Sequence, residues 1–355
     1  MKVLIIQQKM IGDVLTSSIL FEALHKKFPK AELHYLIQPH TLPVVENNPY
    51  IDKFIIYNSG LNKNPLKFLQ FVNRIRQEEY THVIDIYSKI STGIITLLSG
   101  ASCRLSYHKK YTSPFYSQTF QNIKNPSTCA GLAIENRMQF LQAFHTDFPM
   151  HARPKIYLEK LQKEKAATHL EQGGICHSNP LIMCGILGSS GNKSYPPAYM
   201  SKLLDTVANQ VKDSQILFNY SPSQEKEAIA IYNLCSETTR SRIFFKLYAR
   251  ELADYISNCA NCDIFIGNEG GAANIAKALA VPTFSIHSPS IKKNYWGIYC
   301  DDRDKVSVHL EDYEPSLFQN KKEKEIRAKN LKYYKVFRPE LIQPKLESFL
   351  KNLDL

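Results

Sequence analysis

Short apolar runs alternate with helix-like segments along most of this chain of 355 residues. The first run, residues 3–6, contains no polar residue, which favours a strand buried on both faces of a parallel sheet. Apolar residues at helical spacing follow between residues 15 and 24, and alternating apolar residues at 33–37 indicate a second strand. Further strands are expected at 54–56 and 83–86. The pattern predicts an α/β fold of the doubly wound class.

The alternation starts again in the second half of the chain. It follows a charged helix at 159–171 and the pair Gly173-Gly174, which together are typical of an interdomain linker. Four more strands are predicted there, at 181–186, 216–218, 264–266 and 283–286. The second half therefore predicts a second Rossmann-like sheet.

These patterns predict three parts: an N-terminal domain at 1–165, a C-terminal domain at 175–325 and a helical tail at 326–355. In the tail, apolar residues share one helical face, so we expect the tail to pack against the protein: Leu346, Phe349, Leu350 and Leu353. A binding site between the two Rossmann-like domains is the default expectation, because each offers loops at the carboxyl ends of its strands.

Composition and charge narrow the class of protein. The N-terminal apolar run is too short for a signal peptide, and no later stretch approaches the roughly 18 apolar residues of a membrane span, so we expect a cytoplasmic protein. The eight cysteines are expected to be free thiols. Residues 321–338 hold eight Lys or Arg and two Glu, which suits phosphorylated substrate, acidic lipid or simply a solvated helix face. Nucleic acid is disfavoured, because no binding motif for it accompanies the charge.

Gly12-Asp13 follows the first predicted strand, at the carboxyl edge of the sheet. Asp13 could act there as a general base. It could also simply cap the helix that follows, and the residues alone favour that second interpretation.

Two loops of the second half carry residues suited to phosphate. The first, residues 188–196, offers Ser189, Ser190 and Lys193 without matching the P-loop spacing, and an ordinary polar loop is the alternative. The second, residues 266–274, contains Gly270-Gly271 at the start of a helix, whose positive end favours an anion. A glycine pair at a tight turn needs no ligand, but two such loops in one domain strengthen the prediction.

Two acidic residues could bind the hydroxyl groups of a nucleotide or a sugar. Glu269 precedes the glycine pair, and Glu225 begins a predicted helix at 225–234. Glu225 could also simply complement the helix dipole. An acidic run at 301–304 is expected beyond the last strand and away from the loops, so the sequence offers no convincing Asp-x-Asp metal site.

Taken together, the segments resemble glycosyltransferase family 9, the lipopolysaccharide heptosyltransferase family. Three segments in the family's order carry the resemblance: MKVLIIQQKMIGDVL, VIDIYSKISTGIITLLSGASCRLSY and FIGNEGGAANIAKALAVPTFSIHSP. The resemblance implies that Asp13 is the catalytic base, that Lys193 contacts the donor phosphates and that Glu225 binds the nucleoside. The family's Asp-Ser/Thr-Gly is Glu269-Gly270-Gly271 here, and Asn274 stands where the family usually has His.

The resemblance implies a GT-B fold, with two Rossmann-like domains facing a central cleft. It further implies inverting, metal-independent transfer of a sugar, as from ADP-heptose, onto a lipopolysaccharide core acceptor. The catalytic residues would be Asp13 and Lys193, and the donor would be bound by Ser189, Ser190, Lys193, Glu225, Glu269, Gly270, Gly271 and Asn274. The expected partners are a nucleotide-sugar co-substrate and a lipid-linked saccharide, with no cofactor.

The basic stretch 321–338 could hold such an enzyme at the cytoplasmic face of the inner membrane. Two alternatives to transfer remain. A nucleotide-sugar-binding protein without transfer activity is suggested by Asn274, because Asn cannot carry charge. A nucleotide-sugar epimerase of the same two-domain shape is the other alternative.

Overall fold

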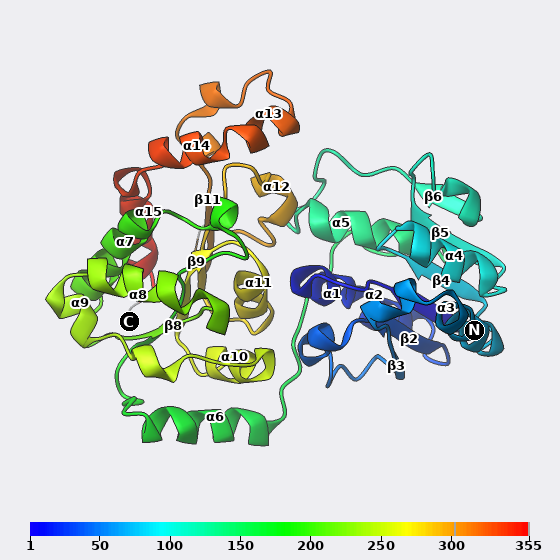
Figure 1. Ribbon diagram of the computed structural model, residues 1–355, viewed down its shortest axis with the longest axis horizontal. Helices are drawn as coiled ribbons and strands as arrows, with labels where there is room; N and C mark the ends of the chain where they lie inside the picture. Colours follow the sequence, from blue (N-terminus) through cyan, green and yellow to red (C-terminus); the bar gives the residue numbers. More distant parts are fainter. Residues whose placement is uncertain (302, 354–355) are drawn as a thin grey trace. The chain divides into compact units, whose positions relative to one another are not determined.

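The protein, described here as a computed structural model over residues 1–301 and 303–353, divides into two compact units, Met1–Tyr157 and Leu158–Leu355. Each unit is a parallel β-sheet with helices packed on it (Figure 1). Helix α6 (Lys160–Gln172) and the C-terminal tail both belong to the second unit. No helix formed by the described residues combines the length and hydrophobicity that a membrane-crossing segment needs. All eight cysteines are free thiols, as predicted.

The sheet of unit 1 has six parallel strands in the order β3-β2-β1-β4-β5-β6. The strands are β1 (Lys2–Ile6), β2 (Glu32–Ile37), β3 (Lys53–Ile56), β4 (His82–Asp85), β5 (Cys103–Tyr107) and β6 (Gln118–Phe120). Residues 3–6 of β1 are fully buried between β2 and β4, with Ile6 paired to Leu36 and to Asp85. The predicted strands of this half are therefore confirmed. The polar composition of β5 and β6 gave no apolar run to detect.

The helices of unit 1 are α1 (Ile11–Ser17), α2 (Ile19–Lys27), α3 (Pro65–Gln77), α4 (Ile90–Leu98) and α5 (Leu132–Met138). Short 3-10 turns are η1 (Pro39–Val44), η2 (Ser59–Lys63), η3 (Ser113–Phe115) and η4 (Gln139–Ala143). The single helix predicted between residues 15 and 24 is interrupted at Ser18, which separates α1 from α2. Helix α3 packs beside α4.

The sheet of unit 2 has five parallel strands in the order β11-β10-β9-β7-β8. They are β7 (Leu181–Gly185), β8 (Gln215–Phe218), β9 (Ile264–Asn268), β10 (Thr283–Ile286) and β11 (Lys305–Val308). All four strands predicted for this half are present. The expectation that residues 301–304 lie beyond the last strand was wrong, because β11 follows them; Lys305 and Ser307 break its apolar pattern. Asp302 lies outside the described residues.

The remaining helices of unit 2 are α7 (Pro197–Gln210), α8 (Glu225–Leu234), α9 (Glu237–Ser241), α10 (Leu252–Cys259), α11 (Gly271–Ala278), α12 (Lys293–Trp296), α13 (Glu323–Ala328), α14 (Asn330–Val336) and α15 (Pro339–Lys351). The tail packs as predicted: Leu346, Phe349 and Leu350 of α15 are buried in the core of unit 2. The ring of Phe349 lies 5.7 Å from that of Phe284 on β10. The tail is therefore part of the folded unit.

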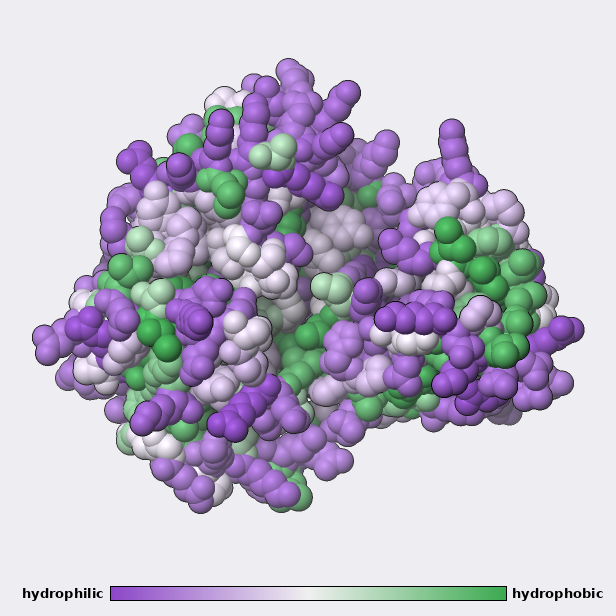
Figure 2. All heavy atoms as spheres, in the orientation of Figure 1, coloured by the Kyte–Doolittle hydropathy of each residue, from purple (hydrophilic) through white to green (hydrophobic). Residues whose placement is uncertain are grey.

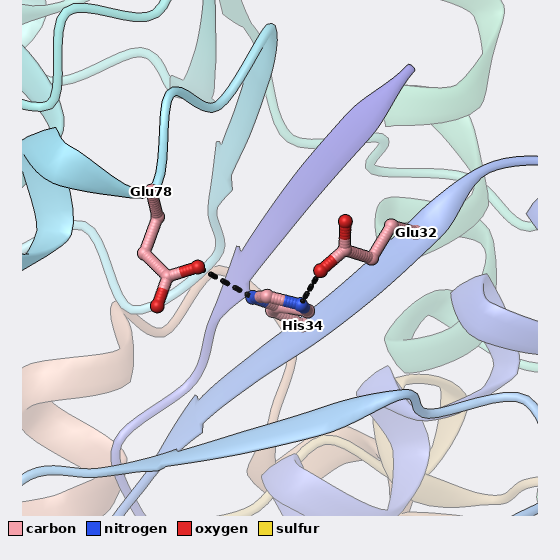
Figure 3. Close-up of side chains that lie close together, drawn as sticks. All are labelled: Glu32, His34 and Glu78. Carbon is pink, nitrogen blue, oxygen red and sulfur yellow. Dashed lines mark hydrogen bonds and ion pairs between the residues drawn. The ribbon is translucent and has the colours of Figure 1, made fainter.

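An ionic network lies at the amino ends of the unit 1 strands. Glu32, His34 and Glu78 bring ligand-type atoms within 4.8 Å of one another, an arrangement that could hold a metal ion (Figure 3). The Lys2 ammonium is already there, 3.2 Å from Glu32 Oε1 and 2.7 Å from Glu78 Oε2, and Lys53 also pairs with Glu78. Hydrogen bonds from Lys2 and Lys53 lower the pKa of Glu78 to about 2. The group is therefore better described as a salt-bridge network.

We expect Glu78→Gln to lower the free energy of unfolding at pH 7 by about 1–2 kcal/mol, because two ammonium groups lose their shared carboxylate. The depressed pKa means that this contribution is complete above the ordinary carboxyl pKa and is lost as the pH falls from about 4.5 towards about 2. Denaturant unfolding at pH 7 and pH 3.5 measures it. Glu79→Gln is the control, because Glu79 has no ion pair with a described residue. Equal loss at both pH values would contradict the assignment.

Candidate active site

Asp13 lies in the first turn of α1, just after the carboxyl end of β1. Its Oδ1 accepts a 2.7 Å hydrogen bond from Arg137 Nη2, and its side chain is 31% exposed. The N-cap of α1 is Met10, with no capping side chain, so Asp13 does not cap the helix. Asp13 Oδ2 has no partner among the described residues. The carboxylate is thus held by one oxygen and can offer the other to a ligand.

Arg137 reaches Asp13 from α5 and is 2% exposed. Its other nitrogens also donate, Nε to Ser17 Oγ at 2.9 Å and Nη1 to the Ala133 carbonyl at 2.6 Å. A guanidinium fixed at three points leaves little freedom to the carboxylate that it binds. No sequence pattern singled out Arg137, because 124 residues separate it from Asp13.

The loop after β7 presents Ser189, Ser190 and Lys193, whose side chains are all exposed. Lys193 forms no ion pair with a described residue. At Gly188 an added Cβ would lie 2.3 Å from the Lys193 carbonyl oxygen, so only glycine allows the loop to fold back this closely. The loop therefore gathers two hydroxyl groups and one ammonium near the carboxyl edge of the sheet.

The loop after β9 carries Glu269, Gly270, Gly271 and Asn274, of which Gly271 begins α11. Gly270 has φ of 155°, a conformation that favours glycine, and no described atom lies within 4 Å of where a Cβ would be. Glu269 and Asn274 are largely buried, at 8% and 5% exposure. The Asn274 side chain makes no hydrogen bond to a described residue.

Two side-chain amides tie the candidate loops together. Asn268, at the end of β9, accepts from the Tyr195 N–H at 2.7 Å and donates to the Gly185 carbonyl at 3.0 Å. Gln224 donates to the Gly188 carbonyl at 2.8 Å and thereby links the loop after β8 to the loop after β7. Because β9, β7 and β8 are neighbours in the sheet, these bonds hold three successive loops together. The structure thus gathers the predicted donor-binding residues at one edge of unit 2.

Glu225 is exposed at the start of α8, beside this edge. An aromatic group that the sequence did not reveal follows β8: the ring of Tyr220 stacks on Tyr248 at 4.6 Å and on Phe245 at 5.6 Å. Burial, with smaller effects of Tyr248 and Glu225, raises the pKa of Tyr220 to about 12. Its hydroxyl has no partner among the described residues. Tyr220 itself is only 4% exposed, so the half-buried rings of Phe245 and Tyr248 are the parts of this group that can present an apolar face to a ligand.

The loop after β7 is also anchored from the tail. Asn330 of α14 donates to the Asn192 carbonyl at 2.6 Å, and Ser288 donates to the same carbonyl at 3.0 Å. Tyr195, which ends the loop, donates to the Phe337 carbonyl at 2.7 Å. The basic stretch 321–338 therefore has an inner side that positions the loop of Lys193, a role that its charge pattern did not indicate.

Buried histidines follow β10 and β11. His287 is fully buried, and neither of its ring nitrogens has a partner among the described residues. Burial lowers its pKa well below the usual range, so His287 is neutral at pH 7. His287 therefore cannot supply a positive charge to the candidate site in place of the neutral Asn274.

The described aspartates of the 301–304 run do not lie at these loops. Asp301 and Asp304 lie at the opposite, amino edge of unit 2, where Asp301 Oδ1 accepts from the Lys305 N–H at 3.0 Å and Asp304 pairs with Lys305 at 2.7 Å. They line a hollow of about 590 Å³ away from the candidate site, together with Arg303, Asn352 and Leu353. The Glu32–His34–Glu78 network also lies at an amino edge.

Solved structures with the same arrangement of elements identify the fold. The glycosyl transferase family 9 structure from Veillonella parvula DSM 2008 superposes with a TM-score of 0.80 at 17% identity, covering 98% of this chain and 97% of that chain. Escherichia coli heptosyltransferase WaaC with ADP-2-deoxy-2-fluoro heptose gives 0.63 at 13% identity, over 87% and 93%. The two units have the GT-B fold of glycosyltransferases, as predicted.

The sequence identifies the family. The model of glycosyltransferase family 9 (heptosyltransferase) matches residues 68–326, and the chain belongs to this family of enzymes. A Haemophilus influenzae protein named "Putative glycosyltransferase" is 23% identical over 294 residues, spanning 81% of this chain and 83% of that protein. Lipopolysaccharide heptosyltransferase 1 of Campylobacter coli is 24% identical over 305 residues, spanning 81% and 83%. The predicted family and enzyme class are confirmed.

We expect Gly188→Ala to destabilise the protein by about 1–3 kcal/mol, because the new methyl group would overlap the backbone of Lys193. Gly191→Ala in the same loop is the matched control, since no described atom lies within 4 Å of its Cβ position. Denaturant unfolding of both variants measures the difference. Equal stability of the two variants would show that the loop does not depend on the close approach at Gly188.

Proposed function

We propose that this glycosyltransferase moves a heptose from ADP-heptose onto a lipopolysaccharide core saccharide, with inversion at the anomeric carbon and without a metal ion. The observation that carries the proposal is the set of hydrogen bonds through Asn268 and Gln224, which gathers three loops of phosphate- and hydroxyl-binding residues at one edge of unit 2. Membership of family 9 makes a nucleotide-sugar donor the natural ligand of such an edge.

The donor would bind to unit 2 through its diphosphate. Lys193 would supply the positive charge, Ser189 and Ser190 hydroxyl donors, and the Gly270-Gly271 start of α11 backbone N–H groups. These groups would stabilise the charge that builds on the leaving diphosphate. Because Lys193 and these N–H groups would supply the stabilising charge, the proposed reaction uses no metal ion.

The nucleoside and the sugar would be held by neighbouring side chains. Glu225 would accept hydrogen bonds from ribose hydroxyls, and the half-buried ring of Tyr248, which stacks on the buried Tyr220, would offer an apolar surface for the base. Glu269 would accept from a sugar hydroxyl, and the amide of Asn274 would hydrogen-bond to the sugar or to a phosphate. A neutral Asn274 leaves Lys193 as the main cationic contact, which predicts a strong dependence of donor affinity on that lysine.

Asp13 would be the base. Its free Oδ2 would take the proton from an acceptor hydroxyl while that oxygen forms a bond to the anomeric carbon, and the bond from this carbon to the diphosphate oxygen would break. The nucleoside diphosphate would leave with the bonding electrons. One displacement of this kind inverts the anomeric centre. Arg137 would keep the carboxylate oriented for the transfer.

The acceptor and the location are also proposals. A lipid-linked saccharide acceptor would place the reaction at the cytoplasmic face of the inner membrane. All eight cations of residues 321–338 are exposed, although Glu323 pairs with Lys292 and Arg327, so the outer side of this stretch could contact anionic headgroups.

We expect Asp13→Asn to lower kcat by about 10²–10⁴ with the Kd for ADP unchanged, because only proton transfer is lost. Asp147→Asn is the control for Asp13, since Asp147 is an exposed carboxylate of the same unit.

Lys193→Ala should raise the Kd for ADP about tenfold to a hundredfold, because one charge-assisted contact to phosphate is lost.

The assay supplies ADP-heptose and a heptose-deficient lipopolysaccharide acceptor, and follows ADP release and the mass of the acceptor. A heavier acceptor supports transfer. Tight donor binding without product would favour a binding protein without transfer activity, and conversion of the donor without acceptor would favour an epimerase. An Asp13→Asn variant with full activity would contradict the role of Asp13.

Arg137 should act as a positioning residue, so we expect Arg137→Met to lower kcat at least about tenfold while the KM values change little. Arg137→Lys should recover part of kcat, because it keeps a charge near Asp13 but not the three separate N–H contacts. Steady-state kinetics on variants checked for folding by circular dichroism measures both. A raised KM for the acceptor with unchanged kcat would instead make Arg137 a substrate-binding residue.

A further inference from the structure

Helix α4 of unit 1 turns an apolar face to the solvent. Ile90, Leu97 and Leu98 are 57%, 41% and 40% exposed, and Ile94 between them is half-buried. Their spacing of four, seven and eight residues from Ile90 places all four on one face. The opposite face is buried and includes Ile95, and the helix contains no charged residue. A helix on the surface of a soluble protein ordinarily has a polar outer face, so this one is unusual.

Only cations flank this face in the sequence. No Asp or Glu occurs from residue 86 to residue 134, while Lys or Arg occurs five times: Lys89, Arg104, Lys109, Lys110 and Lys124. Lys89 is the N-cap of α4, and Lys109 Nζ donates to the Ser88 carbonyl at 2.8 Å, which places the 108–111 loop against the start of the helix. Burial, together with the nearby Lys89, lowers the pKa of Lys109. None of Lys89, Lys109 and Lys110 has an ion pair with a described residue.

The neighbouring helix α3 also exposes apolar side chains and contains no acidic residue. Leu66 and Leu69 are 73% and 55% exposed, and Tyr111 in the 108–111 loop is 59% exposed. No acidic residue occurs from residue 53 to residue 77, which includes α3. Figure 2 shows hydrophobic side chains gathered over the part of unit 1 where Figure 1 labels α3 and α4. We call Ile90, Ile94, Leu97, Leu98, Lys89 and Lys110 the α4 surface.

We propose that the α4 surface docks on an anionic lipid bilayer. The apolar side chains would enter the boundary between headgroups and acyl chains, and the lysines would lie among the phosphates. A helix whose exposed face is apolar fits a deformable bilayer, and the flanking lysines complement acidic lipid. A second copy of the chain fits poorly, because a symmetric contact would bring like charges together.

The inference goes beyond the proposed transfer chemistry and does not depend on it, because docking is measured without donor or acceptor. It also differs from membrane contact through residues 321–338, whose exposed cations would bind by charge alone. Electrostatic binding is screened by salt, whereas inserted apolar side chains keep part of their effect. The dependence of vesicle binding on salt concentration therefore distinguishes docking through the α4 surface from docking through residues 321–338.

The test is co-sedimentation of the full-length protein with vesicles of phosphatidylcholine alone or with 30% phosphatidylglycerol, in 0.1 M and 0.5 M NaCl. Two variants probe the surface: Ile90→Ser/Leu97→Ser/Leu98→Ser and Lys89→Glu/Lys110→Glu. The control is Leu161→Ser/Leu234→Ser, which removes leucines of similar exposure, 55% and 52%, from α6 and α8 of unit 2. A charge-reversed 321–338 variant is run beside them.

We expect the wild type to bind the anionic vesicles and the serine triple variant to bind on the order of tenfold more weakly at both salt concentrations. The lysine pair variant should lose binding mainly at 0.1 M NaCl, and the Leu161/Leu234 control should bind as the wild type does. Binding of the serine triple variant equal to that of the wild type would overturn the proposal. Light scattering could also overturn it, by showing that the wild type is a dimer and that the serine triple variant is a monomer. The α4 surface would then be a contact with a second copy of the chain.

Discussion

The buried side chain of Asn268 is the contact on which the candidate donor site depends most. Its oxygen accepts from the loop after β7 and its nitrogen donates to the end of β7, so one amide joins two neighbouring strands at their carboxyl ends. Both polar ends of a side chain that is only 4% exposed are satisfied. In the same way, the side-chain amide of Gln224 joins the loop after β8 to the loop after β7. The residues suited to phosphate stay together because amides, rather than a ligand, hold their loops.

In unit 1, a single ion pair between Asp13 and Arg137 fixes the candidate carboxylate. The proposed role of Asp13 as a base requires a carboxylate that is both accessible and fixed, and Asp13 is both, because it is 31% exposed and Arg137 binds one of its oxygens from the protein interior. The guanidinium also donates hydrogen bonds to Ser17 of α1 and to the Ala133 carbonyl of α5, so both helices fix the orientation of the Asp13 carboxylate. An unpaired carboxylate in the same turn would sample several rotamers and spend less time aligned for the reaction.

Sequence patterns predicted the strands whose apolar runs are unbroken, such as residues 3–6 and 264–266, because burial on both faces leaves little place for polar residues. They could not predict β11, where Lys305 and Ser307 interrupt the run. The predicted site residues of unit 2 were found on neighbouring loops, since motif positions follow strand ends. Arg137, Asn268 and Asn330 were not foreseen, because their partners are distant in the sequence and only the folded chain brings them together.

The C-terminal tail joins two tasks in one stretch of chain. Phe349 and Leu350 close the core of unit 2, while Asn330 and the Phe337 carbonyl hold the loop that carries Lys193. The tail is therefore structurally continuous with the loop suited to phosphate. Changes that loosen the last helices would therefore displace the loop of Lys193, which lies about 140 residues earlier in the chain.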